Sequence, residues 1–283
     1  MFLCAYYVGM DVYGEITRFY KGLKTEKRII GESLFGRKLY AFKGGEGAPV
    51  GIAVYAVHGR EFITARLALS QYLAGGLTGS VWFIPLANPD GALLSQKGVS
   101  SLPKSHKATF LEQFGEENLS LWKANGRGVD LNVNFDADWG KGAKNVWQPA
   151  SENYVGEAPF SETETQAIKR FTEEINPDYT VSYHTKGEEI YWHYFQSSHT
   201  CPRDKRLAGV LSAVTGYPLK EAKGSVGGYK DWCIQKRKIP AFTVEVGRDE
   251  FSHPLGNEAW EDIDRKNRYA LQALSRAVQT GER

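Results

Sequence analysis

The sequence predicts an α/β fold in which helices cover both faces of a mostly parallel or mixed sheet. Apolar runs at 50–57 and 80–87 are nearly continuous, as expected for strands that are buried on both faces. Helical spacing follows the first run at 61–73, and strands and helices continue to alternate toward the C-terminus. This alternation is typical of βαβ units. A length of 283 residues suits one such domain, and we expect a single domain over 1–283.

The remaining elements follow from the same patterns. Before the first buried run we expect a helix and then two strands, at 11–24, 27–33 and 37–43. A turn at 88–91 closes the second run, and the Gly-, Asn- and Trp-rich stretch 92–160 is expected to form loops. A capping signature at 161–164 opens a helix that runs to about Glu174. The C-terminal part is expected to contain a strand, an extended piece, two helices, a strand and a long helix, at 178–184, 188–195, 204–214, 228–236, 238–247 and 257–278.

Composition and charge exclude several classes of protein. Positive and negative side chains nearly cancel, with a formal net charge of +2, so we expect no nucleic-acid partner. Cys4, Cys201 and Cys233 form no close-spaced pair, which argues against a disulfide framework and a cysteine zinc site. We see neither a signal peptide nor a membrane span. The chain as written is expected to be cytoplasmic, with a processed secreted form as the alternative, and its oligomeric state stays open.

Three residues near predicted strand ends have the chemistry of a metal site. His58 and Glu61 lie at a strand-to-helix junction, and His184 ends the strand 178–184. Two imidazoles and a carboxylate leave one coordination position free, as a catalytic zinc ion requires. The spacing His-x-x-Glu also arises by chance, so a structural histidine remains the alternative at this point.

Six motifs occur in an order that resembles the zinc carboxypeptidase (carboxypeptidase A-like) family. They are AVHGREFITARLAL, ANPDG, GVDLNVNF, SYHTKGEE, GGYKDW and FTVEVG, which start at residues 56, 87, 128, 182, 227 and 242. The resemblance runs from about residue 9 to residue 274. It implies a central eight-stranded mixed sheet, one zinc ion and a peptide substrate, although ligand type alone does not exclude cobalt or manganese.

The resemblance also assigns roles to individual residues. It implies that His58, Glu61 and His184 bind zinc and that Asp130 accepts a hydrogen bond from the His58 imidazole. It makes Glu245 the general base, which takes a proton from a water molecule activated by zinc and passes it to the leaving amine. A carboxylate in the apolar strand FTVEVG is costly to bury without such a task.

Two departures from the family pattern concern the terminal carboxylate of a substrate. The family has an arginine that grips this carboxylate, and the corresponding position here is Val133, which cannot make that contact. The family's mobile tyrosine would fall near Lys223. Tyr217 and Tyr229 lie too far along the chain to be assumed equivalent, although Tyr229 is kept as a candidate for substrate binding.

The substrate pocket is expected to favour an anionic side chain. The family position that sets side-chain preference, just before the Asp-Trp pair, is Lys230. With the neighbouring motifs, this resembles the branch that cleaves γ-D-glutamyl-meso-diaminopimelate bonds in cell-wall peptides. Lys230 would bind the extra carboxylate of diaminopimelate and Glu188 or Glu189 its amine, and Asn132 matches the family asparagine that helps to bind substrate carboxylate or amide groups. A solvent-facing lysine and an exposed glutamate pair are the alternatives.

The residue that stabilises the oxyanion is left open between two cations. Strict counting places Lys123 at the family's arginine position, and Arg127 is the nearest arginine. Arg127 is favoured because it is always charged and offers two donors.

The sequence therefore predicts a zinc peptidase for γ-D-glutamyl-meso-diaminopimelate linkages, acting on a muropeptide. A metallocarboxypeptidase of another specificity and a zinc deacylase are alternative enzymes. A catalytically silent muropeptide-binding protein is the alternative from another class.

Overall fold

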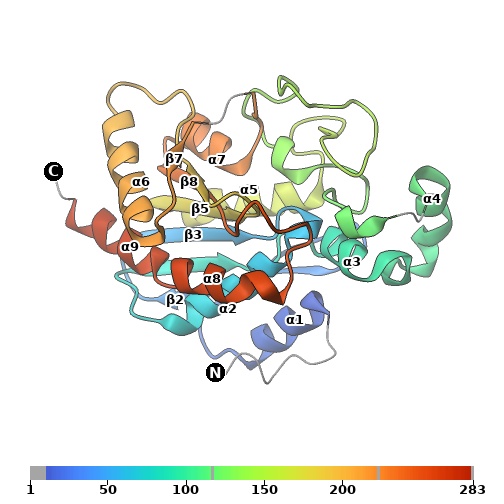
Figure 1. The fold of residues 1–283 in the computed structure, drawn as a ribbon, viewed down its shortest axis with the longest axis horizontal. Helices are drawn as coiled ribbons and strands as arrows, with labels where there is room; N and C mark the ends of the chain where they lie inside the picture. The colour runs from blue at the N-terminus through green and yellow to red at the C-terminus, as the bar shows by residue number, and fades with distance from the viewer. Residues whose placement is uncertain (1–10, 116–117, 222–223, 282–283) are drawn as a thin grey trace.

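The computed structural model describes residues 11–115, 118–221 and 224–281. Cys4 and Lys223 lie outside these ranges. The described residues build one α/β domain around an eight-stranded mixed sheet, which confirms the predicted fold class (Figure 1). The order of the strands across the sheet is β1-β2-β4-β3-β5-β8-β6-β7.

The strands are short and mostly buried. Their bounds are β1 Lys27–Glu32, β2 Lys38–Gly45, β3 Val50–Tyr55, β4 Ser80–Ile84, β5 Tyr179–His184, β6 Glu189–Tyr191, β7 Leu219–Lys220 and β8 Ala241–Glu245. The pairs β4–β3, β3–β5 and β5–β8 are parallel, whereas β1–β2, β2–β4 and β6–β8 are antiparallel. Consequently β3, β5 and β8 end at the same edge in the middle of the sheet.

Helices cover both faces of the sheet (Figure 1). Their bounds are α1 Val12–Gly22, α2 Ile63–Ala74, α3 Pro89–Lys97, α4 Lys104–Phe114, α5 Thr163–Ile175, α6 Cys201–Thr215, α7 Tyr229–Trp232, α8 Asn257–Asn267 and α9 Ala270–Thr280. Alternate residues of a strand point to opposite faces. In β3, Ala53 and Tyr55 pack in the core formed with α1, α2, α6, α8 and α9, whereas Ile52 and Val54 pack in the core that contains α5 and α7.

Several segments differ from the sequence prediction. The predicted turn at 88–91 is the start of α3, since the Asn88 side chain caps Gly91 N and Pro89 takes the first helical position. Helix α4 lies in the stretch predicted as loop, where Phe110 and Phe114 pack on Trp122. The predicted C-terminal helix is two helices, and the two-residue strand β7 was missed. Helix α5 has no side-chain cap of the expected kind.

Within residues 11–115, 118–221 and 224–281, no helix combines the length and the apolar character needed to span a bilayer.

Candidate metal centre

The site forms where three neighbouring parallel strands end. His184 and Glu245 are the last residues of β5 and β8, and they lie opposite each other in the register of the two strands. His58 follows β3 and precedes a single 3₁₀ turn, Gly59–Glu61, which turns the Glu61 side chain back toward His58. Functional residues collect at the carboxyl ends of strands in folds of this kind, because the loops there are free to carry them.

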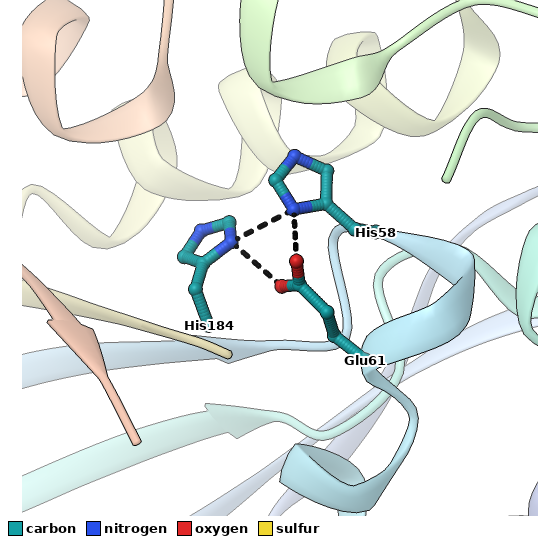
Figure 2. A group of neighbouring side chains, drawn as sticks. All are labelled: His58, Glu61 and His184. Atoms are coloured by element: carbon teal, nitrogen blue, oxygen red, sulfur yellow. Dashed lines mark hydrogen bonds and ion pairs between the residues drawn. The ribbon is translucent and has the colours of Figure 1, made fainter. Parts of the chain in front are cut away.

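The three candidate metal ligands converge on one point (Figure 2). His58 Nδ1 lies 2.8 Å from Glu61 Oε1 and 3.1 Å from His184 Nδ1, and His184 Nδ1 lies 3.0 Å from Glu61 Oε2. Tetrahedral zinc with bonds of about 2.0–2.1 Å separates its ligand atoms by about 3.3 Å. The donor types and their spacing therefore fit a zinc ion, and a catalytic site of this type keeps one position for water or substrate.

The ligand set is buried and its charges are balanced locally. Burial by itself would raise the pKa of Glu61, but His58 and His184 outweigh it and hold this pKa below its usual range. Burial would lower the pKa of His58, whereas Glu61 and Asp130 raise it. Glu61 thus stays ionised, as a metal ligand must.

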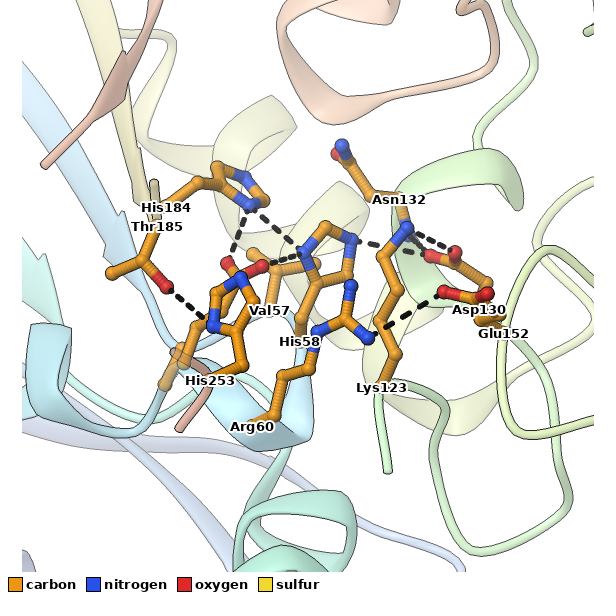
Figure 3. Close-up of polar contacts among 12 residues, drawn as sticks. Val57, His58, Arg60, Lys123, Asp130, Asn132, Glu152, His184, Thr185 and His253 are labelled. Atoms are coloured by element: carbon orange, nitrogen blue, oxygen red, sulfur yellow. Dashed lines mark hydrogen bonds and ion pairs between the residues drawn. The ribbon is translucent and has the colours of Figure 1, made fainter. Parts of the chain in front are cut away.

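Asp130 organises one side of the site (Figure 3). Its Oδ1 faces His58 Nε2 at 3.3 Å, and its Oδ2 lies 2.9 Å from Lys123 Nζ. Its oxygens also accept hydrogen bonds from the backbone N–H groups of Asn132 and Asn153. This arrangement leaves His58 Nδ1 free for a metal, because the second ring nitrogen is turned toward a carboxylate.

Lys123 lies at the metal centre and Arg127 does not. Burial lowers the pKa of Lys123, but Asp130 outweighs this effect and keeps the group positively charged. Arg127 is about half exposed, faces Glu162 at 3.5 Å, and lines a separate groove with Phe35 and Phe114. The structure therefore places Lys123, and not Arg127, beside the metal ligands, which contradicts the preference for Arg127 as the oxyanion residue.

A close backbone approach holds Lys123 in place. Gly59 N donates to the Lys123 carbonyl oxygen at 2.9 Å. A Cβ atom on Gly59 would lie 2.5 Å from the Gly91 carbonyl carbon and 2.7 Å from the Trp122 oxygen. Only glycine lets the turn between two metal ligands approach these backbones so closely.

Glu245 has the environment of a group that binds and releases protons. Burial raises its pKa to about 8, while His184 lowers it and Glu61 raises it further. Glu189 lies directly opposite on β6 and raises it as well. The Glu189 carboxylate accepts a hydrogen bond from Tyr191 at 2.8 Å and pairs with Lys220 at 3.3 Å.

A cavity of about 270 Å³ adjoins Glu245, and we call it the leaving-group pocket. Its lining residues are Asn132, Tyr191, Glu221, Ser225, Gly228, Lys230, Asp231, Thr243 and Glu245. Lys230 is 6% exposed and is not the solvent-facing lysine of the alternative interpretation. Its Nζ atom contacts an oxygen of Asp231, lies 3.3 Å from the His193 oxygen and sits over the Tyr194 ring.

Two predicted substrate residues face elsewhere. Tyr229 is buried in the core, where its hydroxyl lies 2.9 Å from Thr172 Oγ1 and its ring packs on Phe135. Glu188 forms an ion pair with Lys266 of α8 at 2.6 Å. Each side chain has its own protein partner and neither residue lines the leaving-group pocket, so both predictions are corrected.

Sequence reasoning missed four residues near the site. Asp231 and Glu221 line the pocket of Lys230. Arg60 projects beside Lys123, and His253 Nδ1 lies 3.4 Å from Thr185 Oγ1 (Figure 3). Burial lowers the pKa of His253 to about 4, so this ring is neutral. Arg60 and Asp231 lie inside quoted motifs and were open to detection, whereas nothing in the sequence signals Glu221 or His253.

The comparisons with known proteins agree with this geometry. Residues 20–270 match the model of the family described as zinc carboxypeptidase. The chain belongs to this family. Its members use one zinc ion, and His58, Glu61 and His184 supply the matching ligand cluster here.

Three relatives illustrate where the zinc carboxypeptidase chain lies within its family. Gamma-D-glutamyl-L-diamino acid endopeptidase 1 of Lysinibacillus sphaericus is 35% identical over 165 residues, which are 58% of this chain and 41% of that protein. The uncharacterized protein YqgT of Bacillus subtilis (strain 168) is 30% identical over 261 residues, 81% and 66% of the two chains. Murein peptide amidase A of Escherichia coli (strain K12) is 32% identical over 141 residues, 46% and 54%. The matches span less than two thirds of each relative.

Solved structures share the fold at lower identity. Bovine thrombin-activatable fibrinolysis inhibitor, in complex with tick carboxypeptidase inhibitor, superposes with a TM-score of 0.76 at 19% identity, covering 96% of this chain and 98% of that one. Murein-tripeptide amidase MpaA from Escherichia coli O157 gives a TM-score of 0.60 at 24% identity, covering 93% and 95%. These likenesses establish the zinc carboxypeptidase fold for nearly the whole chain.

Proposed function

We propose that this zinc metallopeptidase hydrolyses the peptide bond between a γ-D-glutamyl residue and meso-diaminopimelate in a bacterial cell-wall peptide. The observation that carries the proposal is the buried Lys230 in the pocket beside Glu245. The names of two relatives, a gamma-D-glutamyl-L-diamino acid endopeptidase and a murein peptide amidase, support it.

The charges of the leaving-group pocket suit the end of a diaminopimelate side chain, which carries a carboxylate and an ammonium group. Lys230 has three N–H donors, of which Asp231 and the His193 oxygen take two, so one is left for a substrate carboxylate. Asp231 and Glu221 bring carboxylates that suit the ammonium. A neutral side chain would use neither the third donor of Lys230 nor the Glu221 carboxylate, so it would bind less well than the charged end of diaminopimelate.

The residues around the metal ligands suit peptide hydrolysis. Zinc, when bound, polarises the scissile carbonyl and lowers the pKa of water to about 7. Glu245 accepts a proton from the attacking water as the new C–O bond forms, and it delivers this proton to the nitrogen as the C–N bond breaks. Lys123 donates to the carbonyl oxygen while negative charge develops there, and Asp130 holds Lys123 for that task.

The identity of residue 133 affects whether the enzyme needs a free C-terminus on its substrate. Because valine cannot bind a carboxylate, this position offers no grip on the free C-terminus of a substrate. We therefore expect the enzyme to accept diaminopimelate whose main-chain carboxylate continues into a further residue, as an endopeptidase does.

The test is mass spectrometry of the products from L-Ala-γ-D-Glu-meso-diaminopimelate, with added zinc and in a parallel chelator control. Release of diaminopimelate only with zinc is the expected result. The variant Glu245→Gln should bind zinc and lose turnover, which separates catalysis from contaminating activity.

Other outcomes assign the alternatives. Cleavage of ordinary α-linked C-terminal peptides at a higher rate would indicate a metallocarboxypeptidase of another specificity, and release of a non-peptide acyl group would indicate a deacylase. Binding of the muropeptide by folded, zinc-loaded protein without turnover would indicate a silent binding protein. Each of these results would overturn the proposal.

A further inference from the structure

A second cavity, of about 380 Å³, is lined by Lys123 and Arg60, which lie beside the metal ligands, and Lys230 is not among its lining residues. We call it the acyl pocket, and its polar lining includes Arg60, Lys123, Asn132, Lys144, Asn145 and Glu152. Asn132 and Ser225 line both the acyl pocket and the leaving-group pocket. The two cavities are therefore neighbours along one path.

The order of residues along this path gives each pocket its side of the scissile bond. Glu245, which protonates the leaving nitrogen, lines only the leaving-group pocket of the two. Lys123, which is placed to face the carbonyl oxygen, lines only the acyl pocket. A substrate that places its leaving residue at Lys230 thus extends its acyl residue toward Arg60 and Lys144.

The acyl pocket has more hydrogen-bond donors than partners. Arg60 Nε and Asn145 Nδ2 are buried nitrogen atoms without a hydrogen-bond partner among the described residues. Both atoms are covered by protein in this structure, so a ligand in the pocket would reach these unused donors only after a small rotation of the two side chains.

The charges point to an anion. Lys123 is paired with Asp130, and Arg60 faces Glu152 at 3.6 Å, beyond hydrogen-bond distance, with Glu152 about half exposed. Lys144 has no ion-pair partner within the part of the chain that the structure describes. Because Asp130 balances the charge of Lys123, Arg60 and Lys144 stand against the single, partly exposed carboxylate of Glu152, and the pocket keeps a net charge of about +1.

The loop that carries Lys144 is fixed on both sides of this residue. Ala143 N donates to the Gly224 oxygen at 2.9 Å, and Val146 N donates to the Asn153 oxygen at 3.0 Å. On either side of this segment, Trp139 packs edge-on against Trp147, and the Trp139 ring N–H donates a hydrogen bond to the Val155 oxygen. These contacts hold the backbone of Lys144 at the pocket, so that a long, exposed side chain reaches the ligand from a defined position.

We infer that the acyl pocket binds a carboxylate carried by the acyl residue of the substrate, through Lys144, Arg60 and the Asn145 amide. This inference rests on the proposed function and deepens it. In an α-linked peptide the main-chain carboxyl group of the acyl residue forms the scissile amide bond. In a γ-glutamyl peptide that carboxyl group is free, and it projects from the acyl side as a carboxylate. The pocket would therefore distinguish γ-glutamyl from α-linked substrates.

The experiment compares two tripeptides that differ by one charge. One is L-Ala-γ-D-Glu-meso-diaminopimelate, and the other is the same peptide with the free α-carboxylate of its glutamyl residue converted to the amide. Their kcat/KM values are measured with the parent enzyme, with Lys144→Met and with Lys141→Met. Lys141 is the matched control, since it lies on the same loop, pairs with Asp138 at 2.9 Å and does not line the pocket.

The parent and Lys141→Met should both prefer the carboxylate peptide. Lys144→Met should lower kcat/KM for the carboxylate peptide by about 5- to 30-fold and change the value for the amide peptide little. An unchanged preference in Lys144→Met, with both peptides cleaved, would overturn the inference and leave the proposed function standing. Cleavage of neither peptide by the parent would overturn both.

A third peptide, with the main-chain carboxylate of its diaminopimelate amidated instead, separates the two sides of the bond. If Lys144→Met alters only the response to this change, the pocket binds the leaving residue and the inference is wrong.

Discussion

The Nζ atom of Lys123 lies 2.9 Å from Oδ2 of Asp130, whose other oxygen faces the imidazole of His58 at 3.3 Å. One buried carboxylate thus contacts both the ring of a candidate metal ligand and the neighbouring cation, Lys123. Breaking this pair would leave Asp130 with an uncompensated charge in a buried site, which is a large cost.

The first prediction concerns the choice between Lys123 and Arg127. Lys123→Met should lower kcat by about 10²- to 10³-fold, as loss of an oxyanion donor does, while zinc content stays near one ion per chain. Arg127→Met is the control and should retain turnover within a few-fold, because Arg127 faces Glu162 on another surface. Steady-state kinetics and metal analysis of both variants test this prediction. A large loss of kcat in Arg127→Met, with little loss in Lys123→Met, would identify Arg127 as the oxyanion residue.

The second prediction concerns Lys230. Replacing diaminopimelate by lysine in the substrate removes one side-chain carboxylate and keeps the amine, so the parent should prefer the diaminopimelate peptide. Lys230→Met should reduce that preference in kcat/KM by about tenfold. Because this change leaves Asp231 without its partner, the double variant Lys230→Met/Asp231→Asn is measured beside it. An equal loss on both substrates in both variants would contradict the pocket assignment.

The residues at strand ends were the ones that sequence could place. His184 and Glu245 end neighbouring parallel strands, and a long apolar run fixes where such a strand ends and which edge of the sheet it reaches. His58 and Glu61 follow β3 within one short turn. Their convergence follows from the order of the strands, which the family resemblance implied and the spacing alone did not.

Side chains on turns and short helices could not be placed in this way. Tyr229 and Lys230 are adjacent on the four-residue helix α7, and about 100° of rotation per residue turns one into the core and the other into the pocket. The position of the Arg127 side chain could not be predicted for a related reason. Arg127 is close to Asp130 along the chain, but the chain turns tightly between Lys123 and Asp130, because Asn125 Oδ1 accepts hydrogen bonds from Arg127 N and Val129 N. Closeness along the chain therefore does not tell in which direction the Arg127 side chain points.

The third prediction concerns the backbone approach at Gly59. Gly59→Ala should destabilise the fold by about 1–3 kcal/mol, since its Cβ would meet the Gly91 and Trp122 backbones. It should also weaken zinc binding, because the turn it distorts lies between His58 and Glu61. The control Gly22→Ala has open space around the new methyl group. Urea unfolding and chelator competition measure the two effects, and equal values for both variants would refute the proposed role of this contact.

The last prediction concerns the pH dependence of stability and the carboxyl group of Glu164. This group is fully buried on α5, and burial raises its pKa to about 8, from an ordinary value of 4.5. Its Oε1 atom has no hydrogen-bond partner among the described residues. Because the folded state holds the proton more tightly than the unfolded state, the stabilising contribution is complete below about pH 4.5 and is lost as the pH rises toward 8.

Glu164→Gln keeps the volume of the side chain and cannot lose a proton. The difference in free energy of unfolding, variant minus parent, should therefore increase by about 3 kcal/mol between about pH 5 and pH 8, in favour of the variant. Glu157→Gln, at an exposed position before the same helix, should follow the parent at every pH. Unfolding in urea at saturating zinc measures all three proteins. Parallel curves for Glu164→Gln and the parent would mean that Glu164 is already ionised in the folded state, with its charge stabilised by the buried amide of Asn125, the side chain that lies 3.5 Å away.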